Sequence, residues 1–442
     1  MMWNPRIETM PLDKIKEMQR IQLKKLVNNL YSFNRFYHDR MKEANVSPLD
    51  INTLEDIQKL PFMYKQDLRD NYPDKMFTVD KSEIVRYHMS SGTSGKPTCV
   101  AYTRNDLDYW TEALARSLTA AGLTSDDTIQ IAYGYGLFTG GLGLHYGAER
   151  IGATVLPAST GNTQRQLEMM QDLQCTAIAC TPSYLTHLIT SARQMGIDWK
   201  RDMKLRRCIL GAEPWSESMR AKFEAETGAK CIDIYGTSEQ AGPMFCECEY
   251  QHGPHIAPDI MYMEILDPDT GEVLEPGNKG ELVCTMLKKE AMPMIRYKMK
   301  DITSVNEEPC ECGRTAPRLS RITGRSDDML IIRGINVFPS QIEYTLMRIP
   351  QVGDQYMIKV SREGDLDRMI IQVEIKPESF SDKLEDMQRL RAHIESELKK
   401  YLNIAVPVAP GTSREASGVP CLNPRRGLTL LSPVCRDPAI GV

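Results

Sequence analysis

Between residues 106 and 235, short apolar runs alternate with segments that carry a helical pattern. The apolar runs have the length of buried strands and cover residues 128–132, 153–156, 176–180, 207–210 and 231–235. The helical segments cover residues 106–121, 163–173, 183–195 and 216–227, and another helix starts at the glycine-rich stretch 140–143. This alternation predicts an α/β fold, with a large N-terminal layered α/β domain and a largely parallel sheet.

The pattern changes on both sides of this region. Residues 12–46 look helical and form a lead-in element. From about residue 255, two strands and an Asp-Pro-Asp-Thr-Gly-Glu turn predict a β-rich, antiparallel subdomain. Further on, a hairpin, two strands and two helices predict a small α+β domain. The expected domains are 1–325, with the β-rich subdomain at about 255–325, and 328–410, followed by an irregular tail at 411–442.

The composition excludes several classes of function. The 442 residues carry a net charge of −5 without a basic stripe, which argues against binding nucleic acid or an anionic membrane. There is no apolar run long enough to span a membrane, and the N-terminus lacks the apolar stretch of a signal peptide. The 12 cysteines are therefore expected to be thiols or metal ligands, and the expected compartment is the cytoplasm.

A loop rich in hydroxyls and glycines lies between two extended runs. It reads Ser-Ser-Gly-Thr-Ser-Gly-Lys from Ser90 to Lys96. Such a loop can turn backbone N–H groups and hydroxyls toward a polyphosphate, and Lys96 supplies a positive charge. An ordinary polar hairpin turn is the alternative. A Walker A motif is excluded because only two residues separate Gly92 from Gly95 and Pro97 follows the lysine.

Three informative stretches follow predicted strands. Ligands of open α/β sheets bind beyond the carboxyl ends of the strands. The stretch 133–141 combines aromatic residues with glycines and suits a flat apolar ligand, and 211–213 reads Gly-Ala-Glu. The stretch 235–239 offers an aromatic face, a hydroxyl and a carboxylate, which can stack a base and hold a hard cation. Each stretch alone could equally be a plain strand-to-helix turn.

Taken together and in this order, six segments resemble the adenylate-forming superfamily and, within it, the phenylacetate–CoA ligases. The segments are 90–98, 133–141, 211–215, 235–239, 295–301 and 324–339, and the likeness covers about residues 12–410. The resemblance implies that a carboxylate attacks the α-phosphorus of ATP to give an acyl-adenylate and pyrophosphate. CoA then displaces AMP to give the thioester. Neither step needs a protein nucleophile, since positioning and charge stabilisation can supply the catalysis.

The resemblance assigns roles to the residues of these segments. The nucleotide phosphates are expected to contact Ser90, Ser91, Gly92, Thr93, Ser94, Gly95 and Lys96. The adenine and ribose are expected to contact Gly211, Ala212, Glu213, Asp233, Tyr235, Gly236 and Asp301. The expected catalytic residues are Lys96, Thr237 at the α-phosphate and Glu239 at Mg²⁺.

The resemblance also implies a small, mobile C-terminal domain that swings between two poses. A hinge needs only a few residues with tolerant backbone angles, and the stretch 326–328 fits. Arg325 is expected near the ribose or the hinge, with Asp327 at the hinge itself. Arg333 and Gly334 are expected to meet the pantetheine channel, although a tight hairpin turn also explains them.

The expected acid pocket is a flat, mostly apolar slot formed by Tyr135, Phe138, Gly140 and Gly141, with Ala212 beside it. An aromatic acid of phenylacetate size fits this slot better than a long fatty chain. The exact aryl acid stays open, because one hydroxyl or methylene changes discrimination only modestly in an apolar pocket. The expected partners are thus an aromatic carboxylic acid, ATP and CoA, and a homodimer stays open.

Two groups of cysteines and histidines flank the β-rich subdomain. Thiolates and imidazoles brought together suit a tetrahedral Zn²⁺, and buried thiols are the alternative. The preferred ligand set is Cys248, His255, Cys310 and Cys312, with Cys246 and His252 as alternates. Four protein ligands would make the site structural.

The C-terminus departs from the family pattern. The family places a lysine near the end of the chain, where it reaches the α-phosphate and the carboxylate during adenylation. This chain has Val419 at that position, and Lys400 is its last lysine. Slow adenylation with an intact thioester step is therefore expected. Two alternatives stay open: an adenylating enzyme with a carrier-protein or amine acceptor, and a nucleotide-binding relative with impaired adenylation.

Overall fold

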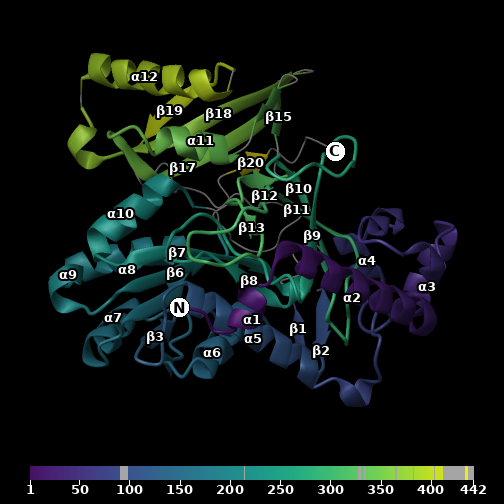
Figure 1. The fold of residues 1–442 in the computed structure, drawn as a ribbon. Coiled ribbons are helices and arrows are strands. Elements are labelled where there is room, and N and C mark those ends of the chain that lie inside the picture. Colours follow the sequence, from purple (N-terminus) through teal and green to yellow (C-terminus); the bar gives the residue numbers. More distant parts are fainter. Residues whose placement is uncertain are drawn as a thin grey trace. The chain divides into compact units, whose positions relative to one another are not determined.

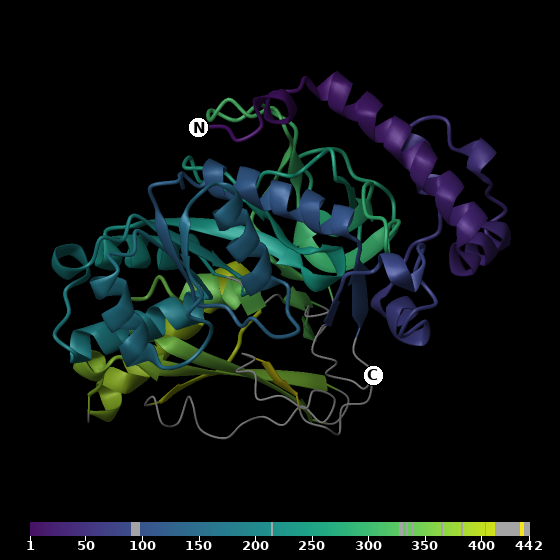
Figure 2. The ribbon, with the colours of Figure 1, turned by 90° about the horizontal axis from the view of Figure 1, so that it is seen from below.

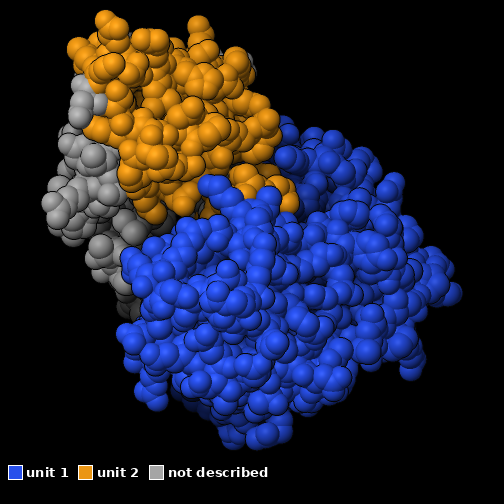
Figure 3. Space-filling view, turned by 90° about the vertical axis from the view of Figure 1, so that its left-hand side faces the viewer, with its two compact units in different colours: residues 1–92, 96–215, 220–322 blue, residues 93–95, 216–219, 323–442 orange. Residues whose placement is uncertain are grey.

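The structure is a computed structural model of the chain. It describes residues 1–89, 98–213, 215–326, 330–332, 335–337, 339–363, 366–381, 383–402, 404–411 and 434–436. The chain forms two compact units, coloured separately in Figure 3. The first comprises residues 1–92, 96–215 and 220–322, and the second comprises the chain from residue 323 together with 93–95 and 216–219. Within the described ranges, we find no helix that is both long and apolar enough to cross a membrane.

The central sheet of the first unit has the strand order β4-β3-β5-β6-β7-β8. Neighbouring strands are parallel from β4 to β7, and only the pair β7–β8 is antiparallel. The strands are β3 (Thr128–Ile131), β4 (Thr154–Leu156), β5 (Ala177–Cys180), β6 (Arg207–Gly211), β7 (Lys230–Thr237) and β8 (Gly242–Cys246). The α/β fold predicted from the alternating pattern is confirmed.

The strand order reverses direction between β3 and β5. The chain leaves β3 to form β4 on one side and then passes β3 again to form β5 on the other side. Because crossovers between parallel strands are right-handed, this reversal puts the connecting helices on opposite faces. Figures 1 and 2 show α5 and α6 on one face and α7, α8 and α10 on the other. The helices are α5 (Arg104–Ala120), α6 (Gly140–Arg150), α7 (Thr163–Asp172), α8 (Pro182–Gln194), α9 (Trp199–Asp202) and α10 (Glu217–Thr227).

The N-terminal region is helical, as expected, but it is not one continuous helix. Asn34 has an extended backbone, and its side-chain oxygen accepts a hydrogen bond from Tyr37 N, which starts a new helix. An asparagine in this role is a typical helix cap. The helices are α1 (Pro5–Glu8), α2 (Leu12–Phe33), α3 (Arg35–Glu43) and α4 (Lys65–Asp70).

The remaining strands of the first unit are antiparallel. β1 (Arg86–Met89) pairs with β2 (Cys99–Tyr102), so the hydroxyl-rich segment connects two paired strands. The β-rich subdomain contains β9 (Met261–Leu266), β10 (Gly280–Met286) and β11 (Tyr297–Thr303), with β10 between its two antiparallel partners. A short pair, β12 (Val305–Asn306) and β13 (Arg318–Leu319), follows.

The second unit is an α+β layer. Its sheet has the order β19-β18-β17-β20, and the long strands β17 and β18 form an antiparallel pair. Ile394, Leu398 and Leu402 of α12 belong to the buried core of this unit. The elements are β14 (Gly324–Arg325), β15 (Leu330–Ile332), β16 (Ile335–Val337), α11 (Pro339–Leu346), β17 (Val352–Glu363), β18 (Leu366–Ile375), α12 (Leu384–Leu402), β19 (Val408–Gly411) and β20 (Val434–Arg436).

Candidate active site

The carboxyl ends of β3, β5 and β6 are joined by one side chain. Tyr133 immediately follows the last turn of the chain after β3, and its hydroxyl donates to the carbonyl oxygen of Cys180 at 2.6 Å. The same hydroxyl lies 3.2 Å from the carbonyl oxygen of Gly211. Burial raises the pKa of Tyr133 well above its usual value, so the hydroxyl keeps its proton. The reversal of strand order lies at this edge, where open α/β sheets bind their ligands.

The turn after β6 has a conformation that its sequence explains. A Cβ on Gly211 would lie 2.1 Å from the carbonyl oxygen of Ile234, so only glycine allows β6 and β7 to approach this closely. Ala212 then adopts a left-handed backbone with φ of 68°. The carboxylate of Glu213 accepts hydrogen bonds from Ser183 N and Oγ, at 3.1 and 2.8 Å, at the start of α8. The turn is thereby fixed to the neighbouring strand–helix connection.

The end of β7 brings together several of the residues predicted to bind nucleotide. The hydroxyl of Tyr235 donates to the carboxylate of Asp301 on β11, which links the central sheet to the β-rich subdomain. A Cβ on Gly236 would lie 2.2 Å from the carbonyl oxygen of Gly242, so this position also needs glycine. Thr237 Oγ1 is buried and has no hydrogen-bond partner among the described residues. It is free to bind a ligand atom.

Glu239 follows in a short 3-10 helix, Ser238–Gln240, and is buried. Its carboxylate forms an ion pair with Lys65 Nζ of α4 at 3.2 Å. The sequence analysis missed Lys65, because no spacing or motif connects α4 with a residue 174 positions further along the chain. The ion pair puts a half-exposed cation beside the carboxylate predicted to hold Mg²⁺.

The predicted acid pocket lies in the loop after β3 and in the first turn of α6. A Cβ on Gly141 would lie 2.9 Å from the carbonyl oxygen of Gly134, so the two ends of the loop touch. Tyr135 is half-buried, and its hydroxyl forms a hydrogen bond with His145 on α6. The side chain of Phe138 is 49% exposed.

This loop is also tied to the end of β1. The carbonyl oxygen of Leu137 lies 3.0 Å from Met89 N, which donates to it. It also lies 3.0 Å from Nδ1 of the buried His88. The strand that leads into the hydroxyl-rich segment and the loop predicted to bind the acid therefore share one carbonyl group.

Asp233 has a different environment from the other predicted nucleotide ligands. Trp215 Nε1 donates to its carboxylate at 2.8 Å, and Arg321 Nε lies 4.0 Å away. Burial raises the pKa of Asp233 to about 6, with the neighbouring Glu247 charge acting in the same direction. Asp233 therefore belongs to a buried network that holds the strand ends.

Several predicted positions lie outside the described residues. These are Ser90, Ser91, Gly92, Thr93, Ser94, Gly95, Lys96, Asp327, Arg333, Gly334 and Val419. Arg325 is described, and it lies in β14 of the second unit.

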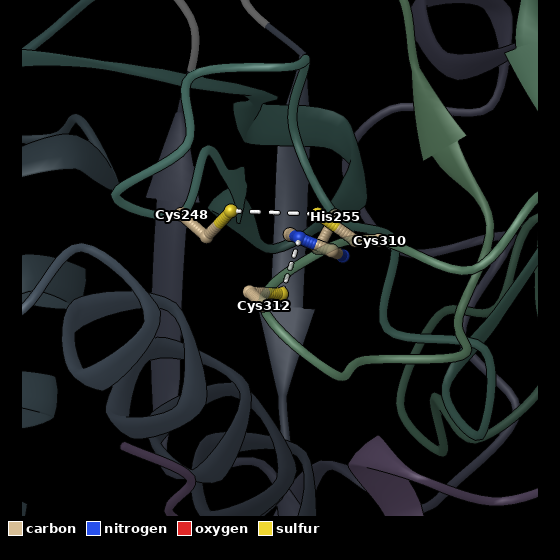
Figure 4. Close-up of side chains that lie close together, drawn as sticks. All are labelled: Cys248, His255, Cys310 and Cys312. Carbon is tan, nitrogen blue, oxygen red and sulfur yellow. Dashed lines mark hydrogen bonds between the residues drawn. The ribbon is translucent and has the colours of Figure 1, made fainter.

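The preferred cysteine and histidine set forms one cluster, shown in Figure 4. The potential ligand atoms of Cys248, His255, Cys310 and Cys312 all lie within 4.8 Å of one another. Cys248 Sγ lies 3.7 Å from Cys310 Sγ, and Cys312 Sγ lies 3.5 Å from His255 Nε2. The first pair of residues follows β8, and the second pair lies in the connection between β12 and β13.

The alternates are not part of this cluster. Cys246 is buried in the main core, and His252 Nδ1 lies 3.8 Å from Glu311. Within the cluster, a hydrogen bond from Cys248 and then the contact with His255 lower the pKa of Cys312. Burial opposes ionisation of Cys310, but the hydrogen bond from His255 outweighs it and lowers that pKa too. The cluster thus favours thiolates, the form that binds metals.

The family models match both parts of the chain. The model of the AMP-binding enzyme matches residues 29–286, which is more than half of the chain. The model of the AMP-binding enzyme C-terminal domain matches residues 334–415.

Individual relatives agree with these matches. The phenylacetate–coenzyme A ligase of Pseudomonas putida is 44% identical over 422 residues, covering 94% of this chain and 95% of the relative. That of Escherichia coli (strain K12) is 44% identical and covers 91% of this chain and 92% of the relative. A crystal structure of 2-hydroxyisobutyryl-CoA ligase in the postadenylation state is 27% identical with a TM-score of 0.88, covering 98% of this chain and 92% of the other. The chain therefore belongs to the AMP-binding enzyme family and, within it, to the phenylacetate–coenzyme A ligases.

Proposed function

We propose that this chain is an ATP-dependent aryl-acid–CoA ligase that acts through an acyl-adenylate. The observation that carries the proposal is the 44% identity to phenylacetate–coenzyme A ligases over nearly the whole chain. In the first step the acid's carboxylate attacks the α-phosphorus of ATP and pyrophosphate leaves. In the second step the CoA thiol attacks the acyl carbon and AMP leaves. The acid we propose is phenylacetate or an aromatic acid of similar size.

The described residues support roles in positioning and charge stabilisation. Asp301, held by the Tyr235 hydroxyl, is oriented to accept the two ribose hydroxyls. Thr237 Oγ1 is buried without a partner, so binding a phosphate oxygen would satisfy it. The carboxylate of Glu239 suits Mg²⁺, a hard cation that prefers oxygen ligands and supplies charge neutralisation at the phosphates.

Lys65 supplies a cation that the C-terminus lacks. Val419 stands where the family has its adenylating lysine, whereas Lys65 lies 3.2 Å from Glu239 in the first unit. We propose that Lys65 stabilises negative charge that develops during adenylation. Preorganised charges at the reacting groups are often the largest contribution to catalysis.

The test is a panel of aryl acids with ATP, Mg²⁺ and CoA. Phenylacetate, benzoate, hydroxyphenylacetates and indoleacetate are compared, and AMP and thioester are measured in the same reactions. Equal amounts of AMP and aryl-CoA, with saturable dependence on CoA, are expected for at least one acid. AMP without thioester would instead favour a carrier-protein or amine acceptor, and no pyrophosphate from any acid would refute the ligase.

We also propose a structural Zn²⁺ at the Cys248, His255, Cys310 and Cys312 cluster. A tetrahedral ion with Zn–S bonds of about 2.3 Å requires sulfur atoms about 3.8 Å apart. Cys248 and Cys310 lie 3.7 Å apart, so the donors fit this geometry. Because all four positions would be filled by protein ligands, the ion would stabilise the fold and would take no part in the reaction.

A further inference from the structure

Three side chains form a hydrogen-bonded series that leads from the surface of α6 to the predicted acid pocket. The hydroxyl of Tyr135 lies 3.2 Å from His145 Nδ1. His145 Nε2 lies 3.0 Å from Glu149 Oε1. His145 and Glu149 are four residues apart on α6, the spacing that brings two side chains to the same face of a helix.

The chemistry of the last member sets the direction of both hydrogen bonds. A carboxylate can only accept, so Nε2 of His145 must carry the hydrogen that Glu149 binds. In neutral imidazole, Nδ1 is then an acceptor, and the hydroxyl of Tyr135 donates to it. The oxygen of Tyr135 has therefore used its only hydrogen and keeps its lone pairs for another donor.

The position of Tyr135 makes this orientation relevant to the substrate. Tyr135 follows β3 at the reversal of strand order, where a ligand is expected, and its loop is closed by the contact of Gly134 with Gly141. Burial raises the pKa of Tyr135, so the phenol is neutral and does not repel an electron-rich ring. Its ring meets the His145 ring edge-on, with centroids 5.8 Å apart, which further fixes its orientation.

We propose that His145 and Glu149 are positioning residues that orient Tyr135 as a hydrogen-bond acceptor toward the aromatic ring of the acid. The pocket then favours aryl acids that carry a ring hydroxyl over acids with a methyl group of similar size. This inference rests on the proposed ligase function and on the location of the acid in the loop after β3.

The test measures a ratio, so that general damage to the enzyme cancels. The kcat/KM values for 3- and 4-hydroxyphenylacetate are divided by those for 3- and 4-methylphenylacetate. Y135F is expected to lower this ratio by about 3–10-fold for at least one ring position, the value of one hydrogen bond. H145L is expected to lower it as well, and Y135F/H145L no further than Y135F alone. H145N is expected to keep most of it, because the amide oxygen can replace Nδ1 as acceptor.

Glu149 provides a sharper variant. In E149Q the amide can donate to Nε2, which permits the other tautomer of His145, with Nδ1–H donating to the Tyr135 oxygen. E149Q is therefore expected to lower the hydroxyl-to-methyl ratio while phenylacetate itself is still converted. E168Q on α7, whose side chain lies at the surface, is the matched control and is expected to leave the ratio unchanged.

Two outcomes would overturn the inference while the ligase function stands. One is conversion of phenylacetate with a ratio that Y135F, H145L and E149Q leave unchanged. The other is a ¹⁵N spectrum of histidine-labelled protein, with the His145 signals identified through H145N, that shows hydrogen on Nδ1. The second measurement needs no turnover, so it tests the orientation even if the enzyme accepts a different acid. Failure of every aryl acid in the wild type would refute the ligase function and, with it, the role in substrate choice.

Discussion

At the scale of single residues, Lys65 is the most informative position in the candidate site. K65M is expected to slow adenylation by about 10²-fold, because it removes a preorganised charge from the site. K65R should recover part of this loss. The measurement is the rate of pyrophosphate release with saturating aryl acid.

A surface lysine serves as the control for this change. Lys81 pairs with Asp74 and is 72% exposed, so K81M should leave the rate unchanged. Equal rates in K65M and the wild type would show that the ion pair with Glu239 has no catalytic role.

Lys289 provides a test of burial and pH. Its Nζ lies 3.5 Å from the ring centroid of Tyr102, and it has no hydrogen-bond partner among the described residues. Burial lowers its pKa from 10.5 to about 8. The folded state thus disfavours the charged form, and the free energy of unfolding should increase as the pH rises from 8 to 10.5.

Replacing this lysine should stabilise the protein at neutral pH. K289M keeps most of the apolar stem and removes the buried charge, so its free energy of unfolding at pH 7 should exceed that of the wild type by up to about 3 kcal/mol. The difference should disappear near pH 10.5, where the wild-type lysine is neutral in both states. Denaturant unfolding of both proteins across this pH range gives the comparison, and a gap that does not change with pH would contradict it.

Residue types alone predicted some of these groups and not others. Cys248, His255, Cys310 and Cys312 were identifiable because few functions other than metal binding gather thiols and imidazoles. Lys65 was not, because a lone lysine on an amphipathic surface helix has no distinguishing pattern. His145 and Glu149 have a helical spacing that the sequence does show, but only the structure reveals that Tyr135 completes the series.

At the scale of elements, the metal cluster fastens a weak part of the fold. β12 and β13 contain two residues each, too few for an independent hairpin. Removing the metal with a chelator should therefore lower the Tm of the first unit by several degrees and release one zinc per chain. C312S should have the same effect.

The control for the metal experiment is a buried cysteine outside the cluster. Cys175 packs before β5, so C175A should retain zinc. Protein that contains no zinc before chelation, after expression with zinc supplied, would refute the metal site.

β1 and the loop after β3 should act together in binding the two substrates of the first step. His88 and Met89 both contact the Leu137 carbonyl, next to the segment predicted to hold the phosphates. H88L should raise the KM for ATP and for the aryl acid together, by about 3–10-fold each, because one hydrogen bond is lost. H88N, which can still donate to this carbonyl, should recover most of both values. An effect on only one substrate would contradict the coupling.

Most elements could be predicted from the sequence because their apolar periods are strong. The strands β3 to β7 and their helices lie within a few residues of the predicted positions. The break between α2 and α3 was missed because the apolar pattern continues through Asn34, and only its backbone shows that it caps a new helix. The contact between Tyr235 and Asp301 was also beyond the sequence, because it depends on how two sheets pack.

At the scale of the whole molecule, the chain's unusual C-terminus should divide the two half-reactions. Adenylation should be slow, and CoA attack on a supplied aryl-adenylate should proceed normally. V419K is expected to raise the rate of pyrophosphate release by about 10²-fold and to leave the second step unchanged. Rapid-quench measurements of each half-reaction give the test. No gain in V419K would contradict this expectation and leave Lys65 as a sufficient cation.

The bridging phenol of Tyr133 has a consequence for how new specificities could arise. One hydroxyl fastens the tips of three strands together, and the Leu137 carbonyl anchors the adjoining loop through its main chain. The side chains of Leu137 and Phe138 meanwhile point outward and are 58% and 49% exposed. Selection or engineering can therefore exchange these two side chains to suit other acids while the foundation beneath them stays intact.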